Sequence, residues 1–274
     1  MPKSQRDFVA RPLAGLPLEA ELVAMREILP AAVATARLTE DRGGGPVHFV
    51  TLLPAMARAH KRADGVPVVA MAPAHPSGDV SQDLGNALVA ALAAAPKTAA
   101  KPAPLGDPGP RLQELIDPAG PVGFELRESF DYWTELDPED ETLADTAVKM
   151  AEEVTPTRAV GGIVGAYWTQ INGREYLRWS LGVDEDDLLD ALARLQSRRL
   201  AGVTEGARYA GAFRALGVVI PVWELPPGAG AEALAEPLAE FKQRLDAALA
   251  QTEPLDSAAR RSRAGLVARF LTLR

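Results

Sequence analysis

The pair Asn172-Gly173, which lies between two apolar strand patterns, constrains the fold of this 274-residue chain more than any other feature. Asn-Gly is the preferred sequence for the two-residue type I′ turn of a β-hairpin. With these residues as the loop, Ile171 pairs with Arg174, and the register of both strands is fixed. Side chains alternate across a sheet, so a slip of one residue would bury Arg178 and expose two tryptophans.

The two faces of this hairpin differ in character. One face is apolar and is predicted to line a core, with Val164, Ala166, Trp168, Leu177, Trp179 and Leu181. The other face is mixed, and we predict three of its residues, Tyr167, Tyr176 and Arg178, as binding residues. Tyrosines beside an arginine on a rigid sheet suit contact with a protein or a ligand. A helix covering this face would instead make the tyrosines part of the core, and both alternatives stay open.

A second hairpin is predicted to turn at Ala215-Leu216-Gly217. Pairing Arg214 with Val218 across this turn sets Tyr209 opposite Trp223 further along the strands. Pro221 has no N–H to donate to a ladder, which predicts either an edge strand or a bulge at that position.

Two arginines of this hairpin suggest an alternative function. Arg208 and Arg214 are expected on one face of their strand, where only small side chains separate them. They could hold an anionic small molecule, with Glu205 as the acid or base of an enzyme. Arg208 also falls opposite Glu224, which would neutralise it.

Proline and charge indicate how the chain is divided. Five prolines and two glycines fall between residues 94 and 110, a composition typical of an extended linker. We predict domains at 1–95 and 111–274, joined by a linker at 96–110. Residues 1–120 hold 12 basic and 12 acidic side chains, whereas residues 121–274 hold 17 and 25 and carry the net charge of −8.

Hydrophobic periodicity predicts an α+β fold of two units, each with a mainly antiparallel sheet covered by helices. Both units show the order helix, strand, strand, helix, strand, helix, which raises the alternative of a duplication. Helices are predicted at 18–29, 55–62, 79–95, 138–154, 184–199, 231–250 and 257–271. Strands are predicted at 32–38, 47–53, 66–72, 122–126, 160–171, 174–181, 207–215 and 218–224.

Several function classes lack their sequence signatures. The chain has no cysteine, no P-loop, no dinucleotide-binding glycine motif and no Gly-x-Ser-x-Gly. His48, His60 and His75 stand singly, without acids at the spacing of zinc ligands. We therefore predict no catalytic residues, no metal site and no cofactor. Neither a signal peptide nor a membrane-spanning segment is predicted, which favours a cytoplasmic protein.

The final residues, 260–274, are basic and partly amphipathic, and no acid follows Asp256. They could form an arm for nucleic acid or for an acidic partner. We favour the alternative, in which this terminal helix docks on its own acidic half and packs four apolar side chains inward, namely Leu266, Val267, Phe270 and Leu271. The net negative charge argues against nucleic-acid binding by the rest of the surface.

Several runs of the sequence resemble an actinobacterial family known only as a domain of unknown function. These runs are residues 11–27, 112–118, 205–214, 219–225 and 260–263. The resemblance spans nearly the whole chain and implies a cytoplasmic protein. It brings no activity and no catalytic residues.

The function is therefore not given by any motif. The absence of a catalytic constellation favours a non-enzymatic binding or adaptor protein with one or more protein partners. It would use the aromatic and arginine face at Tyr167, Tyr176 and Arg178, or a cleft between the two units. No membrane contact is expected.

Overall fold

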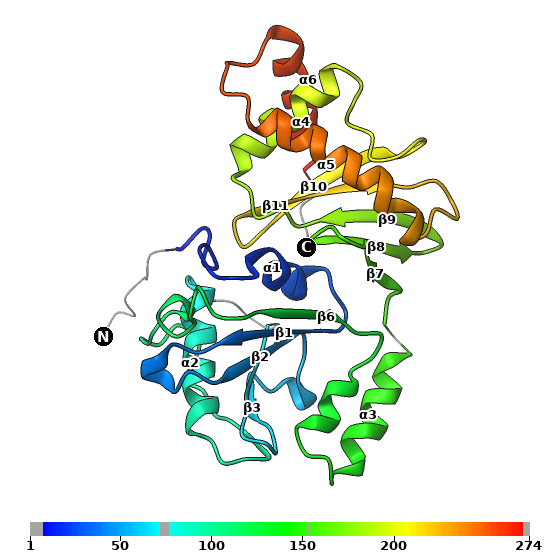
Figure 1. Ribbon diagram of the computed structural model, residues 1–274. Helices are drawn as coiled ribbons and strands as arrows, with labels where there is room; N and C mark the ends of the chain where they lie inside the picture. Colours follow the sequence, from blue (N-terminus) through cyan, green and yellow to red (C-terminus); the bar gives the residue numbers. More distant parts are fainter. Residues whose placement is uncertain (1–7, 72–76, 153, 271–274) are drawn as a thin grey trace. The chain divides into compact units, whose positions relative to one another are not determined.

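The computed structural model describes residues 8–71, 77–152 and 154–270. The chain divides into two compact units, Met1–Val154 (unit 1) and Thr155–Arg274 (unit 2). Each unit combines helices with a mainly antiparallel sheet (Figure 1), so the predicted α+β class is confirmed.

Unit 1 contains a six-stranded sheet in the order β5-β3-β4-β2-β1-β6, in which only β2 and β4 run parallel. Its helices are α1 (Glu19–Glu27), α2 (Val80–Ala93) and α3 (Glu141–Ala151). Its strands are β1 (Ala32–Arg37), β2 (Pro46–Val50), β3 (Ala59–Lys61), β4 (Pro67–Ala70), β5 (Thr98–Ala99) and β6 (Gly123–Leu126).

The proline-rich segment at 96–110 is part of unit 1 rather than a linker between domains. Strand β5 pairs with β3, and Gly106 N–H donates to the buried Asp83 carboxylate of α2 at 2.9 Å. A Cβ on Gly85 of α2 would lie 2.0 Å from the carbonyl oxygen of Pro110, so the segment packs directly on the helix. Strand β6 then pairs with β1. Contacts with α2 therefore hold this segment in unit 1, although its prolines and glycines give it little tendency to form a helix or a strand. The boundary between the two units lies at 154/155.

This boundary changes the distribution of charge. Unit 1 holds 14 Lys and Arg residues against 23 Asp and Glu, whereas unit 2 holds 15 against 14. The predicted acidic second half was produced by residues 121–154, which belong to unit 1. Unit 2 is close to neutral, so any strongly charged site on it is a local feature.

The helix predicted at 55–62 is replaced by a turn and a strand. Ala55 and Met56 adopt left-handed φ values of 52° and 55°, which end any helix there. The following residues form β3 and pair antiparallel with β4. Tertiary strand pairing has overridden a weak helical pattern.

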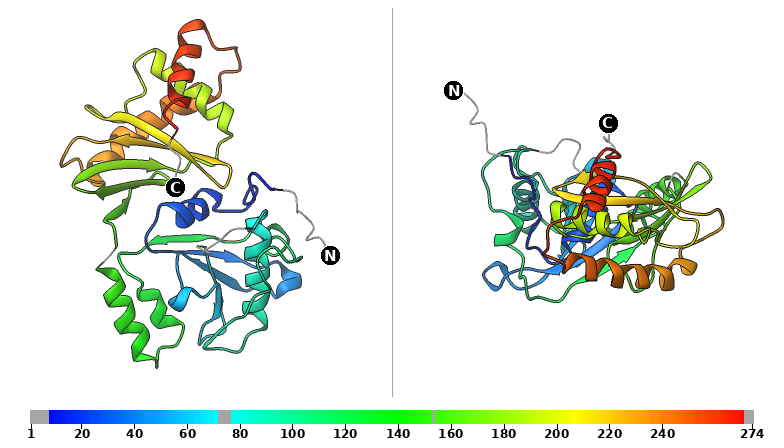
Figure 2. Two further views of the ribbon diagram at one scale, coloured as in Figure 1. Left: turned by 180° about the vertical axis from the view of Figure 1, so that it is seen from behind. Right: turned by 90° about the horizontal axis from the view of Figure 1, so that it is seen from above.

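Unit 2 contains a five-stranded, entirely antiparallel sheet in the order β10-β11-β9-β8-β7. Its strands are β7 (Thr157–Ala159), β8 (Ala166–Ile171), β9 (Arg174–Trp179), β10 (Arg208–Ala215) and β11 (Val218–Glu224). Its helices, α4 (Glu185–Ser197), α5 (Ala235–Leu249) and α6 (Ser257–Val267), gather on one face of the sheet (Figure 2). The two units therefore differ in strand order, and unit 1 contains a parallel pair that the sheet of unit 2 lacks, so their topology does not support the suggested duplication.

The Asn172-Gly173 hairpin forms in the predicted register, from Ile171 opposite Arg174 to Ala166 opposite Trp179. Its apolar face packs under α4 and α5 as part of the unit 2 core, and the ring of Trp179 lies 6.3 Å from that of Phe241. Val164 does not join this core. It is 68% exposed, because the glycine-rich stretch before Ala166 forms a turn rather than the start of β8.

The second hairpin turns at Leu216-Gly217, one residue shorter than predicted, and Ala215 pairs with Val218. The predicted pair of Tyr209 with Trp223 still forms, because a bulge between Tyr209 and Gly211 restores the register. Strand β11 is not an edge strand. Pro221 is tolerated because the pairing of β11 with β9 covers only the three residues that follow it.

The charged side chain most engaged by the fold of unit 2 is Glu175 on β9. Its carboxylate accepts hydrogen bonds from the Trp168 indole at 2.7 Å and from the N–H groups of Gly228 and Gly230 at 2.5 and 2.8 Å. These donors hold the pKa of Glu175 below its usual range against the effect of burial. The residue is 6% exposed and ties the loop before α5 to the sheet.

In the described ranges, no helix is both long enough and apolar enough to cross a bilayer.

Candidate anion-binding site

The bulge in β10 places Arg208 and Arg214 on opposite faces of the strand. Tyr209 and Ala212 both pack into the helix-covered core, although they are three residues apart. Arg208, next to Tyr209, therefore points to the other face, whereas Arg214 shares the face of Ala212. The predicted shelf between the two arginines does not exist.

Each of these two arginines also has a carboxylate partner. Arg208 pairs with Glu224 at 3.1 Å, as the hairpin register predicts. Arg214 binds Glu185, at the start of α4, through two hydrogen bonds of 2.7 and 2.6 Å, and its guanidinium lies over the Phe270 ring at 4.3 Å. The charges proposed to hold a ligand are thus already balanced within the fold.

The aromatic face of the first hairpin is less open than a contact surface requires. Tyr167 is 2% exposed, and Arg178 is largely buried, which lowers its pKa to about 10. Neither side chain is without an interaction in the protein. Tyr176 is half-buried. The structure brings the three residues together on one face, as the register predicts, but it buries Tyr167 and leaves Tyr176 and Arg178 only partly exposed.

Helix α6 docks on α4 through ion pairs of one arginine and through buried apolar side chains. Arg263 binds Asp190 at 2.6 Å and Asp186 at 2.5 Å, both on α4. Leu266 and Ala259 are buried in the unit 2 core, and Phe270 packs against it. This confirms a docked terminal helix rather than a free arm, although Val267 is 40% exposed instead of packed inward. Residues 271–274 lie outside the described residues.

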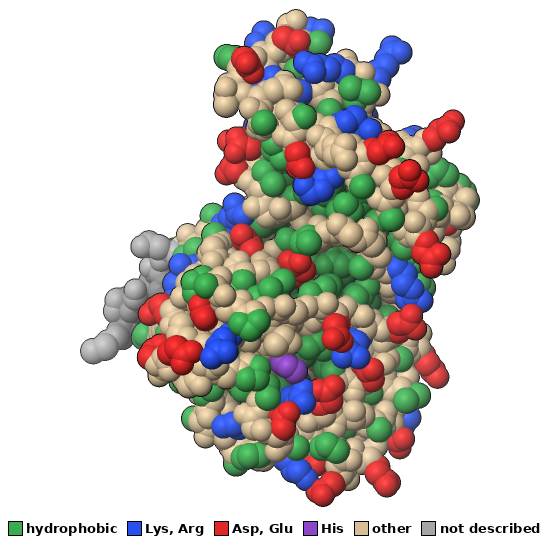
Figure 3. Space-filling model, viewed as in Figure 1, with side chains coloured by type: hydrophobic (Ala, Val, Ile, Leu, Met, Phe, Trp, Pro, Cys, Tyr) green, Lys and Arg blue, Asp and Glu red, His purple; other side chains and the backbone are tan. Residues whose placement is uncertain are grey.

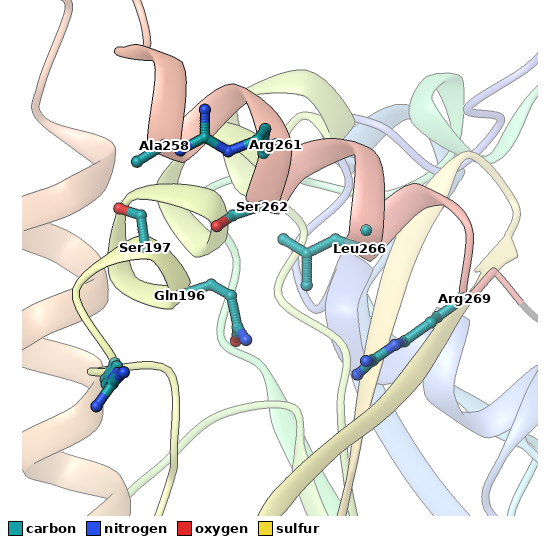
Figure 4. Close-up of a pocket in the computed structure, with 9 residues that line it drawn as sticks. Gln196, Ser197, Ala258, Arg261, Ser262, Leu266 and Arg269 are labelled. Atoms are coloured by element: carbon teal, nitrogen blue, oxygen red, sulfur yellow. The ribbon is translucent and has the colours of Figure 1, made fainter.

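Docking leaves a basic pocket between the carboxyl end of α4 and α6, which we call the arginine pocket. It has a volume of ≈ 470 Å³, and it is lined by Gln196, Ser197, Arg199, Ala258, Arg261, Ser262, Gly265, Leu266 and Arg269. Figure 4 shows side chains of α4 and α6 facing each other across the pocket. Several Lys and Arg side chains, with acidic side chains among them, lie at the top of the space-filling view (Figure 3). Among the described residues that line the pocket, none is acidic.

The three arginines of the pocket are held differently from those on the strands. Arg269 donates to the carbonyl oxygen of Tyr209 at 3.3 Å. Arg199 and Arg261 are exposed, and neither forms an ion pair within the ranges that the structure describes. Among the described residues, none of the three guanidinium groups around this pocket therefore forms an ion pair with a carboxylate.

Arg199 adopts a backbone conformation that favours glycine. Its φ is 61°, and it directly follows the helix cap Arg198. The bonds Leu200 N–H to Leu195 O, at 2.8 Å, and Arg199 N–H to Gln196 O, at 3.1 Å, form a Schellman motif, in which the left-handed residue is usually glycine. An arginine there costs about 1 kcal/mol relative to glycine. Arg199 therefore combines a strained backbone with a place in the lining of the arginine pocket.

A buried hydroxyl lies close to the pocket's third arginine. The Tyr209 hydroxyl has no hydrogen-bond partner among the described residues. Burial raises the pKa of Tyr209 to about 12, and the charge of Arg269 acts in the opposite direction. The guanidinium of Arg269 thus contacts the backbone of Tyr209, whose side-chain hydroxyl has no hydrogen-bond partner among the described residues.

Glu205 lies in a neighbouring pocket of ≈ 630 Å³, which Arg199 and Leu200 also line. Arg244 and two further glutamates, Glu236 and Glu240, complete its charged lining. Glu205 and Arg199 therefore line the same pocket, whose lining does not include Arg208 or Arg214, and Arg199 lines both pockets.

The histidines do not form a metal site in the described residues. His48 Nδ1 lies 3.2 Å from Arg62, which also binds Glu135. Burial, together with the charge of Arg62, holds the pKa of His48 below its usual range. His75 lies outside the described residues. Across the described ranges, no three His, Asp or Glu side chains are placed to hold a metal ion.

Comparison with known proteins assigns a family. One family model matches residues 12–274, almost the whole chain. The chain belongs to DUF5926, a family of unknown function. No curated protein and no solved structure matches it. The expected membership of a family without known activity is thus confirmed for this DUF5926 protein, whereas its actinobacterial origin and cytoplasmic location stay predictions.

The sequence contained both halves of the arginine pocket without showing that they meet. Arg198 and Arg199 end a predicted helix, and Arg260 and Arg261 begin the basic tail. The sequence predicts that the tail docks, but it does not predict which of its arginines faces α4. In the structure Arg263 pairs with Asp190 of α4, whereas Arg261 lines the pocket.

Proposed function

We propose that this protein is a binding or adaptor protein and that the arginine pocket of unit 2 holds an anionic segment of a protein partner. The observation that carries the proposal is the set of Arg199, Arg261 and Arg269 around one pocket, in which no described lining residue is acidic. Like charges held close together repel each other, and a bound anion relieves that repulsion.

The chemistry of the pocket favours anions that can form two parallel hydrogen bonds. Arginine binds carboxylate and phosphate through a planar pair of N–H donors, which lysine cannot provide. All three basic residues of the pocket are arginines. The strain at Arg199 is a further support, since a strained backbone is retained where the side chain has a use.

The surroundings of the pocket favour a segment of a protein as the ligand. The pocket is open on the surface, so a group carried on another chain can enter it. Leu200, which follows the pocket residue Arg199, and Val267, which follows the pocket residue Leu266, are 45% and 40% exposed. Exposed apolar side chains beside arginines are typical of protein interfaces.

The alternative enzyme on an anionic small molecule has less support. It relied on Arg208 and Arg214, which lie on opposite faces of β10 and are each paired with a glutamate. The aromatic face at Tyr167, Tyr176 and Arg178 stays a prediction for protein contact, weakened by the burial of Tyr167.

Fluorescence anisotropy of labelled hexaglutamate with the full chain tests the proposal. We expect binding that weakens as salt is added, and an Arg261→Ala variant that binds about three- to fivefold more weakly. Arg174→Ala is the matched control, because it removes the same charge from the hairpin turn of β9, outside the pocket. Absence of binding, or equal losses in both variants, would contradict the proposal.

A second pair of variants blocks the pocket from within. Nothing lies within 4 Å of a Cβ added at Gly265, which lines the pocket on α6. Gly265→Glu places a carboxylate beside the arginines and is expected to abolish binding. Its neutral match, Gly265→Gln, has the same size and should bind nearly as the wild type does. Both should gain about 0.5 kcal/mol from helix propensity, so a loss of binding would not reflect unfolding.

A further inference from the structure

The hydrogen-bond donors around the arginine pocket exceed what a carboxylate can use. Besides the three guanidinium groups, Ser262 and Gln196 line the pocket, and their side chains form no hydrogen bond within the described part of the chain. The Ser197 hydroxyl, by contrast, already donates to the carbonyl oxygen of Arg194 at 2.9 Å. A carboxylate offers two oxygen atoms, whereas a phosphate monoester offers three terminal oxygens.

The charges lead to the same conclusion. A carboxylate would balance one of the three positive charges at the pocket, and a phosphate monoester carries nearly two negative charges at pH 7. By contrast, Arg263 on the same helix is already paired with two aspartates of α4, Asp186 and Asp190. In the part of the chain that the structure describes, the pocket arginines form no ion pairs that would compete with an incoming dianion.

We infer that the anionic group is a phosphoryl group on a serine or threonine of the partner protein. This inference rests on the proposed function, since it names the chemistry of the segment that the pocket binds. Clusters of arginine are a recurring means of recognising phosphorylated segments. We assign Ser262 as a specificity residue. Its hydroxyl can donate to the third terminal oxygen of a phosphate monoester, an oxygen that a carboxylate lacks.

The composition of unit 2 makes the inference testable by pH. The second pKa of a phosphate monoester is about 6. Residues 155–274 contain no histidine, so no side chain of unit 2 with an ordinary pKa changes charge between pH 5 and 7.5. A change of affinity in this range therefore reports on the ligand.

The experiment uses the full chain and three labelled peptides that differ only at one central residue: phosphoserine, glutamate or serine. At pH 7.5 we expect the phosphoserine peptide to bind about tenfold more tightly than the glutamate peptide, and the serine peptide not to bind. Between pH 7.5 and 5 the phosphoserine peptide should lose most of this advantage, whereas the glutamate peptide should bind equally at both values.

Ser262→Ala should reduce the affinity for the phosphoserine peptide and leave that for the glutamate peptide unchanged. Ser257→Ala is the matched control, since it removes a hydroxyl from the first turn of the same helix, outside the pocket lining. A melting temperature close to that of the wild type in both variants would show that a change in affinity is not a change in folding.

Two competitors separate the sources of phosphate. Free phosphoserine should compete weakly, because the partner chain supplies the remaining contacts; equal competition would assign the pocket to a small phosphorylated ligand instead. A single-stranded oligodeoxythymidylate should also compete weakly, and its phosphodiesters do not titrate in this range. Strong competition by it would overturn the inference in favour of nucleic acid.

Equal affinity for the phosphoserine and glutamate peptides would overturn the inference and leave the proposed function intact. Failure of both peptides and of hexaglutamate to bind would overturn both.

Discussion

Unit 2 carries two sets of arginines whose surroundings differ. On strand β10, Arg208 and Arg214 each bind a glutamate, and Arg214 also covers an aromatic ring. Between α4 and α6, Arg199 and Arg261 line a pocket in which no described residue is acidic. The first set is engaged by the fold, and the second is the one that we propose binds a ligand. Residue type does not distinguish the two sets, because both consist of arginines. They differ in whether a carboxylate lies close enough to form an ion pair.

The largest effect is expected where a charge is engaged most completely by the fold. Glu175→Ala would leave the Trp168 indole and two backbone N–H groups, at Gly228 and Gly230, without their acceptor. We expect a loss of about 3 kcal/mol in the free energy of unfolding of unit 2. Chemical denaturation followed by tryptophan fluorescence measures it. A loss below about 1 kcal/mol would show that Glu175 is not a structural anchor.

Arg214→Ala tests the strand set at a more exposed position. The side chain is 54% exposed, so solvent weakens its ion pair with Glu185, and its contact with Phe270 adds a modest amount. We expect a destabilisation of about 1 kcal/mol and no change in the affinity for hexaglutamate. Weaker binding in this variant, with its stability unchanged, would break the division into two sets.

Arg199→Gly tests the helix set and should have effects of opposite sign. Glycine accepts the left-handed backbone at this position without strain, so unit 2 should gain about 0.5–1 kcal/mol in stability. The pocket would lose one guanidinium, and the affinity for hexaglutamate should fall about threefold. Stability comes from chemical denaturation and affinity from anisotropy. A destabilised variant would mean that the Arg199 side chain supports the fold.

The smallest effect is expected in unit 1, where a change of pH alters the charge of two histidines, His48 and His60. Burial holds the pKa values of His48 and His60 below their usual range, and Arg62 adds to this effect at His48. The unfolded chain therefore binds more protons just below pH 6.5, so the folded state loses stability as the pH falls through that value.

Replacing both histidines by glutamine should reduce this pH dependence, because the replacements do not titrate. Melting temperatures of the variant and the wild type, compared at pH 7.5 and 5.5, measure the difference. Unit 2 has no histidine and should show no comparable decrease. The same pH dependence in the variant and the wild type would contradict this account.

Local sequence rules predicted the parts of the fold that depend on neighbouring residues. The Asn172-Gly173 turn gave the register of β8 and β9, and the acidic run from Asp184 gave the start of α4, where Asp184 caps the helix. These features follow from turn chemistry and capping within a few residues. The pairing of Arg208 with Glu224 followed from the hairpin in the same way.

The features that the sequence did not reveal all depend on contacts between distant segments. The segment at 96–110 belongs to unit 1 because Asp83 and Gly85 of α2 bind and accommodate it. The bulge in β10 exchanges the faces of its two arginines, and no strand propensity indicates a single extra residue. The arginine pocket requires the end of α4 to meet α6, which only the docked helix shows.

The most direct test of the anion-binding pocket is a nuclear magnetic resonance titration of the isotope-labelled full chain with hexaglutamate. The account predicts shifts of the backbone amides of Ser197, Arg199, Ser262 and Gly265, which line the pocket, with little change at Arg208 and Arg214. Shifts centred on β10 instead, or no saturable shifts at all, would contradict it.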